Sequence, residues 1–352
     1  MRVTYWTTAC LEPRIEAISK EVDDLAHAFT GSRVFAVSPF LGMTVRERGR
    51  VLGFHRAFDP FIRPLIWMLE RATDVNHVYA DIAPWIIFRS IRVRPTVLTI
   101  AEGKADMVTT FLDRSDAIVV QTTETRRALE ALGYGPPRVT LIYPGIDLSA
   151  FARGPRRRTG DGRTTILLAT FPRTVEELEA RGINFLLQMA ARYDDVDFVF
   201  VSRPWARQST ALDEVKARIA RDGLSNVRIL EGVQTDMASL YGQVDFTVVP
   251  FTTPDGGKEC PRSLVESLAC GVPVLISSRA TFSGFVAERA CGSVFDLDDT
   301  SFGRAIEASL SRYDDQARRA TEVAHGHFDV RATFRSYAAI YERLSNNGRA
   351  PR

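Results

Sequence analysis

Residues 250–277 read PFTTPDGGKECPRSLVESLACGVPVLIS and contain the clearest structural pattern in the chain. A short apolar strand leads into this stretch, a loop with Gly256 and Gly257 follows, and a helix is expected from about Ser263 to just before Gly271. A β-branched and apolar run begins directly after that glycine. A strand, a loop, a helix and a second strand in this order predict an α/β unit with parallel strands.

The same alternation recurs along both halves of the chain. Apolar residues at helical spacing, such as Ile18, Val22 and Leu25, mark a helix over 15–29, and another is expected at 125–132. Strands are expected at these short β-branched or apolar runs: 3–6, 33–37, 96–100, 117–121, 139–143, 165–169, 198–201, 227–230, 246–249 and 272–276. Repeated strand–helix alternation predicts parallel sheets that helices cover on both faces.

A change of composition divides these runs into two domains. The segment 151–165, FARGPRRRTGDGRTT, is rich in Gly, Pro and Arg and is expected to be a linker. We therefore predict two Rossmann-like, doubly wound α/β domains facing a cleft, with residues 1–150 in the first and 166–329 in the second. A last helix, 330–345, is expected to pack back on the first domain. In such sheets, ligands bind beyond the carboxyl ends of the strands.

The predicted linker holds five arginines, which are Arg153, Arg156, Arg157, Arg158 and Arg163. A solvated linker is the simpler interpretation, and contact with an anionic membrane surface is the alternative. No run approaches the ~20 apolar residues that a spanning helix needs, and the N-terminus lacks the apolar core of a signal peptide. We therefore expect no integral membrane segment.

The composition favours a globular enzyme of the cytoplasm. Of 352 residues, 45% are hydrophobic and 25% are charged, and 45 basic against 43 acidic residues leave a net charge of +2. A nucleic-acid partner is not expected, because such proteins usually carry a strong basic excess. The four cysteines and five histidines match no metal-site spacing, so no metal is expected, and scattered cysteines suit a reducing compartment.

The loop and helix start within residues 250–277 suit a phosphate group. Glycines let the backbone approach a ligand closely, and the first turn of a helix presents unpaired N–H groups and a partial positive charge. The residues expected to bind a phosphate-bearing donor substrate are Gly256, Gly257, Arg262, Ser263, Leu264 and Glu266. For Glu266 two interpretations stand. Ser263-x-x-Glu266 fits a helix capping box, and a carboxylate also suits the vicinal hydroxyls of a ribose.

This stretch resembles the nucleotide-binding motif of family-4-type retaining glycosyltransferases, the glycosyl transferases group 1 with the GT-B fold. In that family a Gly-rich loop leads into a helix with two glutamates, followed by Ala-Cys-Gly-x-Pro-Val, which is present here at 269–274. Glu266 matches the second glutamate, which the resemblance implies holds the ribose. Lys258 stands in place of the first, with Glu259 beside it, and it stays open which of the two contacts the donor sugar.

Two arginines of the second half match the same family. Arg181, in the run ARGI, stands where the family has a lysine at a helix start, and Arg173, in the run FPR, follows a strand after which the family carries an arginine. The resemblance implies that both clamp the donor diphosphate and take part in catalysis, since a guanidinium makes paired bonds to phosphate. The alternative is that both are ordinary surface arginines. Residues 141–151 and 233–250 also resemble segments of the family.

The first half matches the family less closely. The positions of its usual Gly-Gly pair hold Glu16 and Ala17. Its usual histidine position falls in residues 101–104, where Glu102 is the candidate for a polar contact with a donor or acceptor hydroxyl. The alternative for Glu102 is a solvated loop carboxylate. His77 also matches a family position, and a lone histidine there is more often structural.

The resemblance implies a hexosyl- or related glycosyltransferase. Such an enzyme moves a sugar from a nucleoside-diphosphate sugar to a hydroxyl of a carbohydrate, lipid-linked or small-molecule acceptor, with retention of anomeric configuration. The nucleotide sugar is then a co-substrate, and no further cofactor is obligatory. Two alternatives stay open, which are a catalytically silent, nucleotide-binding relative and a GT-B-fold epimerase or phosphorylase.

Overall fold

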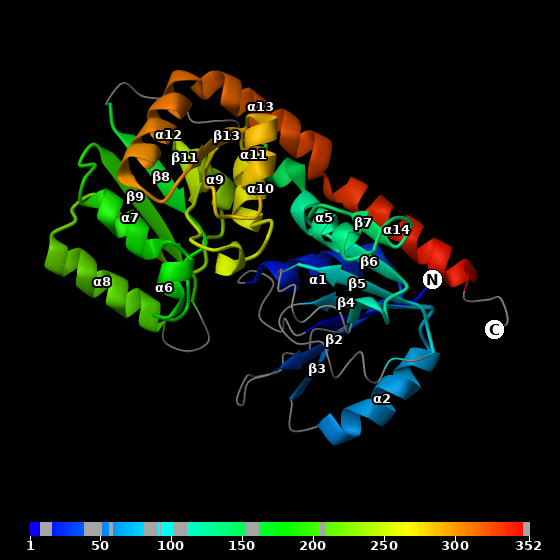
Figure 1. Ribbon diagram of the computed structural model, residues 1–352. Coiled ribbons are helices and arrows are strands. Elements are labelled where there is room, and N and C mark those ends of the chain that lie inside the picture. The colour runs from blue at the N-terminus through cyan, green and yellow to red at the C-terminus, as the bar shows by residue number, and fades with distance from the viewer. Residues whose placement is uncertain are drawn as a thin grey trace. The chain divides into compact units, whose positions relative to one another are not determined.

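The computed structural model describes residues 1–7, 16–38, 51–55, 59–80, 91, 93–101, 111–152, 162–204 and 209–347. The chain forms two compact units, Ile146–Val330 and Met1–Gly145 together with Arg331–Arg352. Each unit contains one parallel β-sheet flanked by helices (Figure 1). Most of the predicted linker, with Arg153, Arg156, Arg157 and Arg158, lies outside the described residues.

The first unit is built on a seven-stranded sheet in the order β3-β2-β1-β4-β5-β6-β7, with all neighbouring strands parallel. Its strands are β1 Val3–Thr7, β2 Arg33–Ser38, β3 Val51–His55, β4 Val75–Ala80, β5 Thr96–Ile100, β6 Ala117–Val120 and β7 Val139–Leu141. The helices described for this unit are α1 Ala17–Ala28, α2 Asp59–Arg71, α5 Thr123–Ala131 and α14 Val330–Asn347, which starts at the unit boundary.

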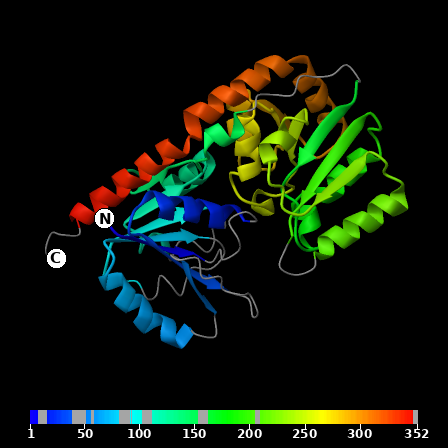
Figure 2. The same ribbon diagram turned by 180° about the vertical axis from the view of Figure 1, so that it is seen from behind.

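Helices cover both faces of the first sheet. Successive strand residues point to opposite sides, so Tyr5 packs in the core under α1 and α14, while Trp6 packs in the core under α2 and α5. The α14 side chains in this core are Tyr337, Ile340, Tyr341 and Leu344. In Figure 2 the red α14 runs beside the blue and cyan elements of this unit.

The second unit is built on a six-stranded sheet in the order β10-β9-β8-β11-β12-β13, again all parallel. Its strands are β8 Thr164–Leu168, β9 Val196–Ser202, β10 Val227–Glu231, β11 Phe246–Val249, β12 Val274–Ser277 and β13 Gly292–Phe295. Its helices are α6 Glu177–Ala180, α7 Ile183–Ala190, α8 Thr210–Asp222, α9 Met237–Tyr241, α10 Arg262–Ala269, α11 Ser283–Arg289, α12 Asp299–Ser311 and α13 Tyr313–His327. Two short 3₁₀ turns, η2 Leu148–Phe151 and η3 Pro254–Gly256, complete the unit.

Both faces of the second sheet are covered as well. Ile166 and Leu168 of β8 pack in the layer that contains α7, α8, α12 and α13, whereas Leu167 and the following Ala169 pack in the layer that contains α9. Burial on both sides explains why the central strands read as continuous apolar runs. The observed sheets are therefore the doubly wound α/β units that the sequence predicted.

The strand order reverses once in each sheet. In the second unit the chain winds outward from β8 through β9 to β10 and then continues on the other side of β8 with β11, β12 and β13. In the first unit the reversal lies between β1 and β4. Parallel sheets bind ligands beyond the carboxyl ends of the strands beside such a point. In the second unit these are the ends of β8 and β11.

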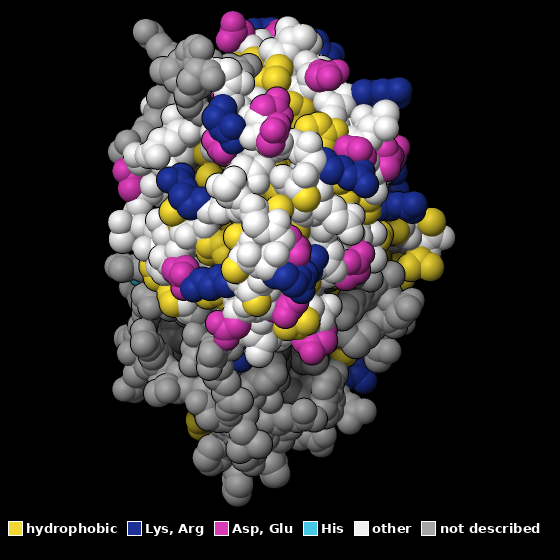
Figure 3. All heavy atoms as spheres, turned by 90° about the vertical axis from the view of Figure 1, so that its left-hand side faces the viewer, with side chains coloured by type: hydrophobic (Ala, Val, Ile, Leu, Met, Phe, Trp, Pro, Cys, Tyr) yellow, Lys and Arg dark blue, Asp and Glu magenta, His cyan; other side chains and the backbone are white. Residues whose placement is uncertain are grey.

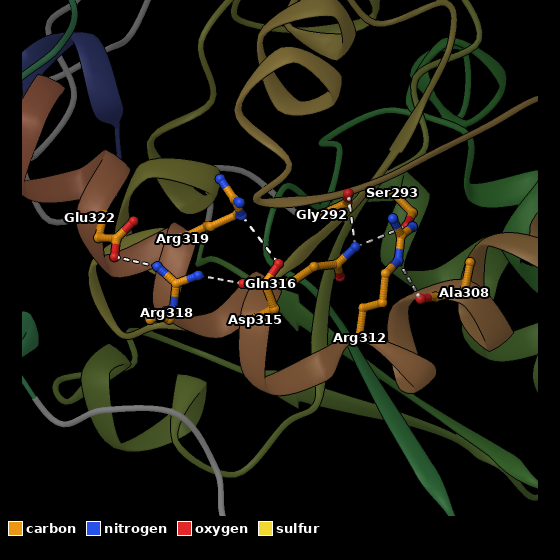
Figure 4. A network of polar contacts seen from close by, with 9 residues as sticks. All are labelled: Gly292, Ser293, Ala308, Arg312, Asp315, Gln316, Arg318, Arg319 and Glu322. Atoms are coloured by element: carbon orange, nitrogen blue, oxygen red, sulfur yellow. Dashed lines mark hydrogen bonds and ion pairs between the residues drawn. The ribbon is translucent and has the colours of Figure 1, made fainter.

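The edge strand β13 is held close to β12 and to α13. A Cβ atom on Gly292 would lie 2.0 Å from the Val274 carbonyl oxygen, so this approach requires a residue without a side chain. The Gln316 amide on α13 donates to the Gly292 carbonyl at 3.1 Å and to the Ser293 hydroxyl at 3.3 Å (Figure 4). Gln316 thereby satisfies a backbone carbonyl on a strand that has only one β neighbour.

Charged side chains of both signs are interspersed on the face of the molecule in Figure 3. The pairs Arg163–Asp197 and Lys216–Glu231 are examples of exposed ion pairs in the second unit. Pairs this exposed typically stabilise a protein by no more than about 1 kcal/mol. The packed apolar layers, and not surface pairs, therefore supply most of the stability.

A buried polar network joins α14 to the first sheet. His77 on β4 is fully buried, its Nδ1 lies 2.6 Å from the Tyr341 hydroxyl, and its Nε2 lies 2.7 Å from Thr99 Oγ1. Burial lowers the pKa of His77 to about 3, so the imidazole is neutral at pH 7 and pairs as one donor and one acceptor. His77 therefore has a structural place in the core.

Because folded His77 stays neutral, we expect acid to destabilise the first unit. The unfolded imidazole takes up a proton below about pH 6.5, whereas the folded group does so only near a pKa of about 3. The stability that neutral His77 contributes is thus present above about pH 6.5 and is lost as the pH falls, by up to about 1.4 kcal/mol per pH unit.

Chemical denaturation of the wild type and His77→Gln at about pH 7.5, 6 and 5 measures this loss. The free energy of unfolding of the wild type should fall more steeply with acid than that of the variant. Parallel pH dependence in the two proteins would contradict the assignment of a neutral, buried His77.

Candidate functional site

Glycines bring the loops after β8 and β11 together in the second unit. A Cβ atom on Gly182, between α6 and α7, would lie 1.9 Å from the carbonyl oxygen of Pro250, directly after β11. Gly182 also has a φ of +71°, in the left-handed region that favours glycine. A Cβ atom on Gly256 would lie 2.4 Å from the Ala180 carbonyl oxygen. These approaches hold the α6–α7 junction against the loop that leads to α10.

Arg181 lies against Gly257 as a result. A Cβ atom on Gly257 would lie 2.4 Å from Arg181 Nη1, and the guanidinium carbon of Arg181 lies 5.5 Å from the Phe251 ring centroid. The Thr252 N–H donates to the Ala180 carbonyl at 3.1 Å and ties the two segments together. The structure thus brings Arg181 and the glycine loop, which are far apart in the sequence, to the same place.

Arg173 lies in the loop after β8, at the carboxyl end of that strand. Its N–H donates to Glu177 Oε2 at 2.9 Å, and its carbonyl accepts from the Ser209 hydroxyl at 3.0 Å. The side chain is half-buried, and its guanidinium has no hydrogen-bond or ion-pair partner among the residues that the structure describes. Backbone contacts therefore fix the position of Arg173 in this loop.

Lys258 and Glu259 lie between the glycine loop and α10, and both are buried, with exposed fractions of 7% and 5%. Charged groups buried to this degree are costly unless other polar groups surround them. The two residues therefore belong to the interior of this loop and not to its solvated surface. Which of them faces a donor sugar stays a prediction.

The start of α10 does not form the capping box that was one of the two interpretations of Glu266. The N-cap residue is Pro261, which has no capping side chain, and the helix begins at Arg262. The Ser263 hydroxyl is buried and makes no hydrogen bond within the described part of the chain. The capping-box interpretation is therefore wrong. The fully buried Leu264 uses its N–H to reach the Pro261 carbonyl at 3.0 Å.

Glu266 is held by two donors of the protein. Its Oε1 accepts from Arg262 Nε at 3.0 Å, and its Oε2 accepts from the Tyr241 hydroxyl at 3.2 Å. The side chains of Arg262 and Glu266 are each only 14% exposed, so water screens this pair less than a surface pair. Burial, followed by the nearby Glu266 carboxylate, raises the pKa of Tyr241 well above its usual value, so its hydroxyl keeps its proton.

Tyr241 is a residue that sequence reasoning missed. It is the last residue of α9 and lies 25 positions before Glu266 in the chain. No spacing rule connects an aromatic residue on one short helix with a carboxylate on another. The only signal in the sequence is an aromatic residue on the apolar side of a helix, and most such residues serve the core alone.

The remaining predicted positions lie in the first unit. Glu16 is the N-cap residue of α1, where its carboxylate accepts from the Ser19 hydroxyl, and Ala17 is the first residue of that helix. Glu102 lies outside the described residues. Roles for these three residues in binding a sugar or an acceptor therefore stay predictions.

Three of the four cysteines, Cys260, Cys270 and Cys291, are buried free thiols, and Cys10 lies outside the described residues. Burial raises the pKa of the Cys291 thiol to about 12. Within the described ranges, no three His, Cys, Asp or Glu side chains gather in a way that could hold a metal ion. None of the described helices is both long enough and apolar enough to cross a membrane.

The second unit matches a known protein family. Residues 167–312 match the family model described as Glycosyl transferases group 1. This match assigns the segment 167–312 to the glycosyl transferases of group 1. The matched segment contains Arg173, Arg181 and the whole of α10, so it includes the candidate site of the second unit. The family that residues 250–277 indicated is thereby confirmed.

The curated relatives that the chain matches are named as glycosyltransferases. The chain is 27% identical over 248 residues to the D-inositol 3-phosphate glycosyltransferase of Mycobacterium sp. (strain KMS), covering 68% of this chain and 53% of that protein. The protein of the same name from Thermomonospora curvata is 28% identical over 239 residues, covering 60% and 52%. The chain spans about half the length of these curated relatives.

Solved structures match over nearly the whole chain. Anabaena Alr3699/HepE in complex with UDP and glucose superposes with a TM-score of 0.77 at 16% identity, covering 98% of this chain and all of that one. Sucrose-phosphate synthase from Thermosynechococcus elongatus gives a TM-score of 0.74 at 15% identity, covering 98% and 99%. At such identities the likeness shows the fold, which is the predicted two-domain α/β fold of GT-B glycosyltransferases.

The close approach at Gly182 yields a test of how the site is held. In Gly182→Ala the new methyl group meets the Pro250 carbonyl, and the residue must also keep a left-handed φ. We expect the free energy of unfolding to fall by about 2–6 kcal/mol, from backbone strain and overpacking together. Chemical denaturation measures this loss.

Gly223→Ala is the matched control. Gly223 also has a positive φ, +64°, but no atom lies within 4 Å of the position that its Cβ would take. This variant should lose only about 1–2 kcal/mol, for the left-handed conformation alone. Equal losses in the two variants would show that the contact with Pro250 does not constrain the site.

Proposed function

We propose that this protein transfers a sugar from a nucleoside-diphosphate sugar to an acceptor hydroxyl, and that its second unit binds the donor. The observation that carries the proposal is the placement of Arg181 against Gly257, in the loop that leads to α10. This arrangement lies at the carboxyl ends of β8 and β11, where parallel sheets bind ligands. It also lies within the segment that matches group 1 glycosyltransferases.

The two arginines of this edge suit the donor diphosphate. Each guanidinium can make paired bonds to phosphate oxygens, and the first turn of α10 adds a partial positive charge. When the sugar leaves, negative charge develops on the nucleoside diphosphate. Cations that are already in position then stabilise the transition state without moving, which is the most effective form of electrostatic catalysis. Arg173 and Arg181 are our candidates for this role.

Other groups are assigned by the resemblance and by their place in the fold. We propose that Glu266 accepts hydrogen bonds from the ribose and that Lys258 or Glu259 contacts the donor sugar. The positions proposed for the sugar or acceptor side are Glu16, Ala17 and Glu102. Retention of anomeric configuration follows from the family that the motifs resemble. The proposal needs no cofactor other than the nucleotide sugar itself.

The compared proteins suggest which substrates to test first. The Anabaena structures contain UDP, glucose or UDP-glucose, so UDP sugars are the first donors to try. The curated relatives are named for D-inositol 3-phosphate, which is one small-molecule acceptor to include. The three buried free thiols support a reducing compartment such as the cytoplasm. Peripheral contact with a membrane through the linker arginines remains the alternative to a purely cytoplasmic location.

Replacing Arg181 tests the donor site. A thermal-shift screen of UDP, GDP and ADP with their sugars first identifies the donor that stabilises the wild type. Arg181→Ala should then weaken binding of that donor by about 10- to 100-fold, because a hydrogen bond to a charged group is worth about 1.5–3 kcal/mol. Isothermal titration and the donor Michaelis constant both measure this.

Arg163→Ala is the matched control for the loss of an arginine. Arg163 pairs with Asp197 at the surface and precedes β8, so it lies at the amino end of the sheet, opposite the proposed site. It should change donor affinity by less than about 2-fold, as expected of an exposed ion pair. An unchanged donor Michaelis constant in Arg181→Ala would refute the assigned role. Tight nucleotide binding with neither transfer nor donor hydrolysis would favour the silent relative.

A further inference from the structure

Both oxygens of the Glu266 carboxylate are held by the protein itself, with one donor on each. Arg262 Nε lies 3.0 Å from Oε1, and the Tyr241 hydroxyl lies 3.2 Å from Oε2. An ionised carboxylate has about four acceptor positions, two on each oxygen. The protein therefore occupies one position on each oxygen and leaves one on each. Two open acceptors side by side match a pair of neighbouring hydroxyls.

The hydrogen-bond donor to Glu266 Oε2 is Tyr241, which lies on a different helix from Glu266. Tyr241 is fully buried at the end of α9, in the apolar layer on that face of the sheet. Its single hydroxyl proton is shared between Glu266 Oε2 at 3.2 Å and the Ser263 carbonyl at 3.1 Å, and the second contact ties Tyr241 to the first turn of α10. Since burial and the Glu266 carboxylate raise its pKa, the hydroxyl remains a donor at neutral pH. Tyr241 can therefore hold Oε2 in one direction without moving itself.

Arg262 alone would not give this arrangement. Its planar guanidinium matches both oxygens of a carboxylate, and bidentate pairing is the favoured geometry of such pairs. In the structure only Nε reaches Glu266, and it reaches only Oε1. The bond from Tyr241 to Oε2 keeps the second oxygen out of the guanidinium fork. Without that bond, the carboxylate is free to turn onto Arg262 and to lose the pair of open acceptors.

We propose that Tyr241 is a positioning residue that presents Glu266 to a vicinal diol, so that the site selects nucleotides with both ribose hydroxyls over their deoxy forms. The inference rests on the proposed function, because it takes Glu266 as the ribose contact. It adds a residue of α9 to the site. It also predicts a selectivity that follows from how the carboxylate is held and not merely from its presence.

The test compares ribose and deoxyribose ligands in matched variants. Isothermal titration gives the dissociation constants of UDP and 2′-deoxy-UDP, and of GDP and 2′-deoxy-GDP, for the wild type and Tyr241→Phe. The wild type should prefer the ribose form by roughly 10- to 100-fold, the effect of one charge-assisted hydrogen bond. In Tyr241→Phe the preference should fall below about 3-fold, while affinity for the deoxy form stays unchanged.

Two further variants make the result specific. Tyr193→Phe is the control. The Tyr193 hydroxyl donates to the Asp299 carbonyl at 2.9 Å and makes no contact with Glu266, so this variant loses one tyrosine hydrogen bond elsewhere. It should keep the full preference for the ribose form. Glu266→Gln should lose the preference, and adding Tyr241→Phe to it should change nothing more, since the two residues act as one unit. Arg262→Gln removes the Arg262 hydrogen bond to Oε1 and so tests what this second contact contributes to the ribose preference.

The outcomes separate this inference from the proposed function. If the wild type and Glu266→Gln discriminate as expected but Tyr241→Phe keeps the wild-type preference, the positioning role is wrong and the donor site stands. If Tyr241→Phe weakens the ribose and deoxyribose forms equally, Tyr241 is merely structural and the inference is also overturned. If none of UDP, GDP and ADP binds the wild type, or if Glu266→Gln has no effect on the nucleotide that binds, the proposed donor site itself fails. Should Tyr241→Phe not fold, Tyr241→Leu takes its place, and an unchanged ribose preference in Tyr241→Leu overturns the inference.

Discussion

The close contact between Gly182 and the Pro250 carbonyl is the constraint on which the candidate site depends. At 1.9 Å from a hypothetical Cβ, the backbone after β11 leaves no room for a side chain at the α6–α7 junction. This approach lets Arg181 reach the glycine loop, where a Cβ atom on Gly257 would lie 2.4 Å from Arg181 Nη1. A side chain at Gly182 would meet the Pro250 carbonyl, and one at Gly257 would displace the Arg181 guanidinium. The loops that follow β8 and β11 are thus held together by backbone contacts and by Arg181.

Each unit contains a largely buried ionisable side chain whose polar atoms are met by partners from the protein itself. In the second unit Glu266 is met by Arg262 and Tyr241, and in the first unit His77 is met by Thr99 and Tyr341. The functional difference lies in what remains open. His77 uses both ring nitrogens within the core, whereas Glu266 keeps unused acceptor positions and a small exposed fraction. A satisfied group stabilises the fold, and a partly satisfied one can bind a ligand.

Much of the fold could be predicted because its signals are local. Strands such as β11 and β5 have the expected bounds, and the helix of residues 250–277 lies within one residue of its expected start. The strands β3, β4 and β13 were not predicted. β3 and β13 are short and contain a glycine, Gly53 or Gly292, and polar Asn76 and His77 interrupt the apolar run of β4. The capping box failed for a related reason. Ser263-x-x-Glu266 satisfies the local pattern, but the fold places the N-cap at Pro261 and turns Glu266 toward Arg262 and Tyr241.

The sequence by itself determined the alternation of strands and helices, the family, and the positions of glycines and charged residues, because these depend on neighbours a few residues apart. Only the tertiary structure decided that Arg181 meets Gly257 and that Tyr241 holds Glu266. Such contacts depend on strand order and on how helices pack across the sheet. Strand order and helix packing are decided by how the whole apolar surface is buried, so they cannot be predicted from a short stretch of sequence.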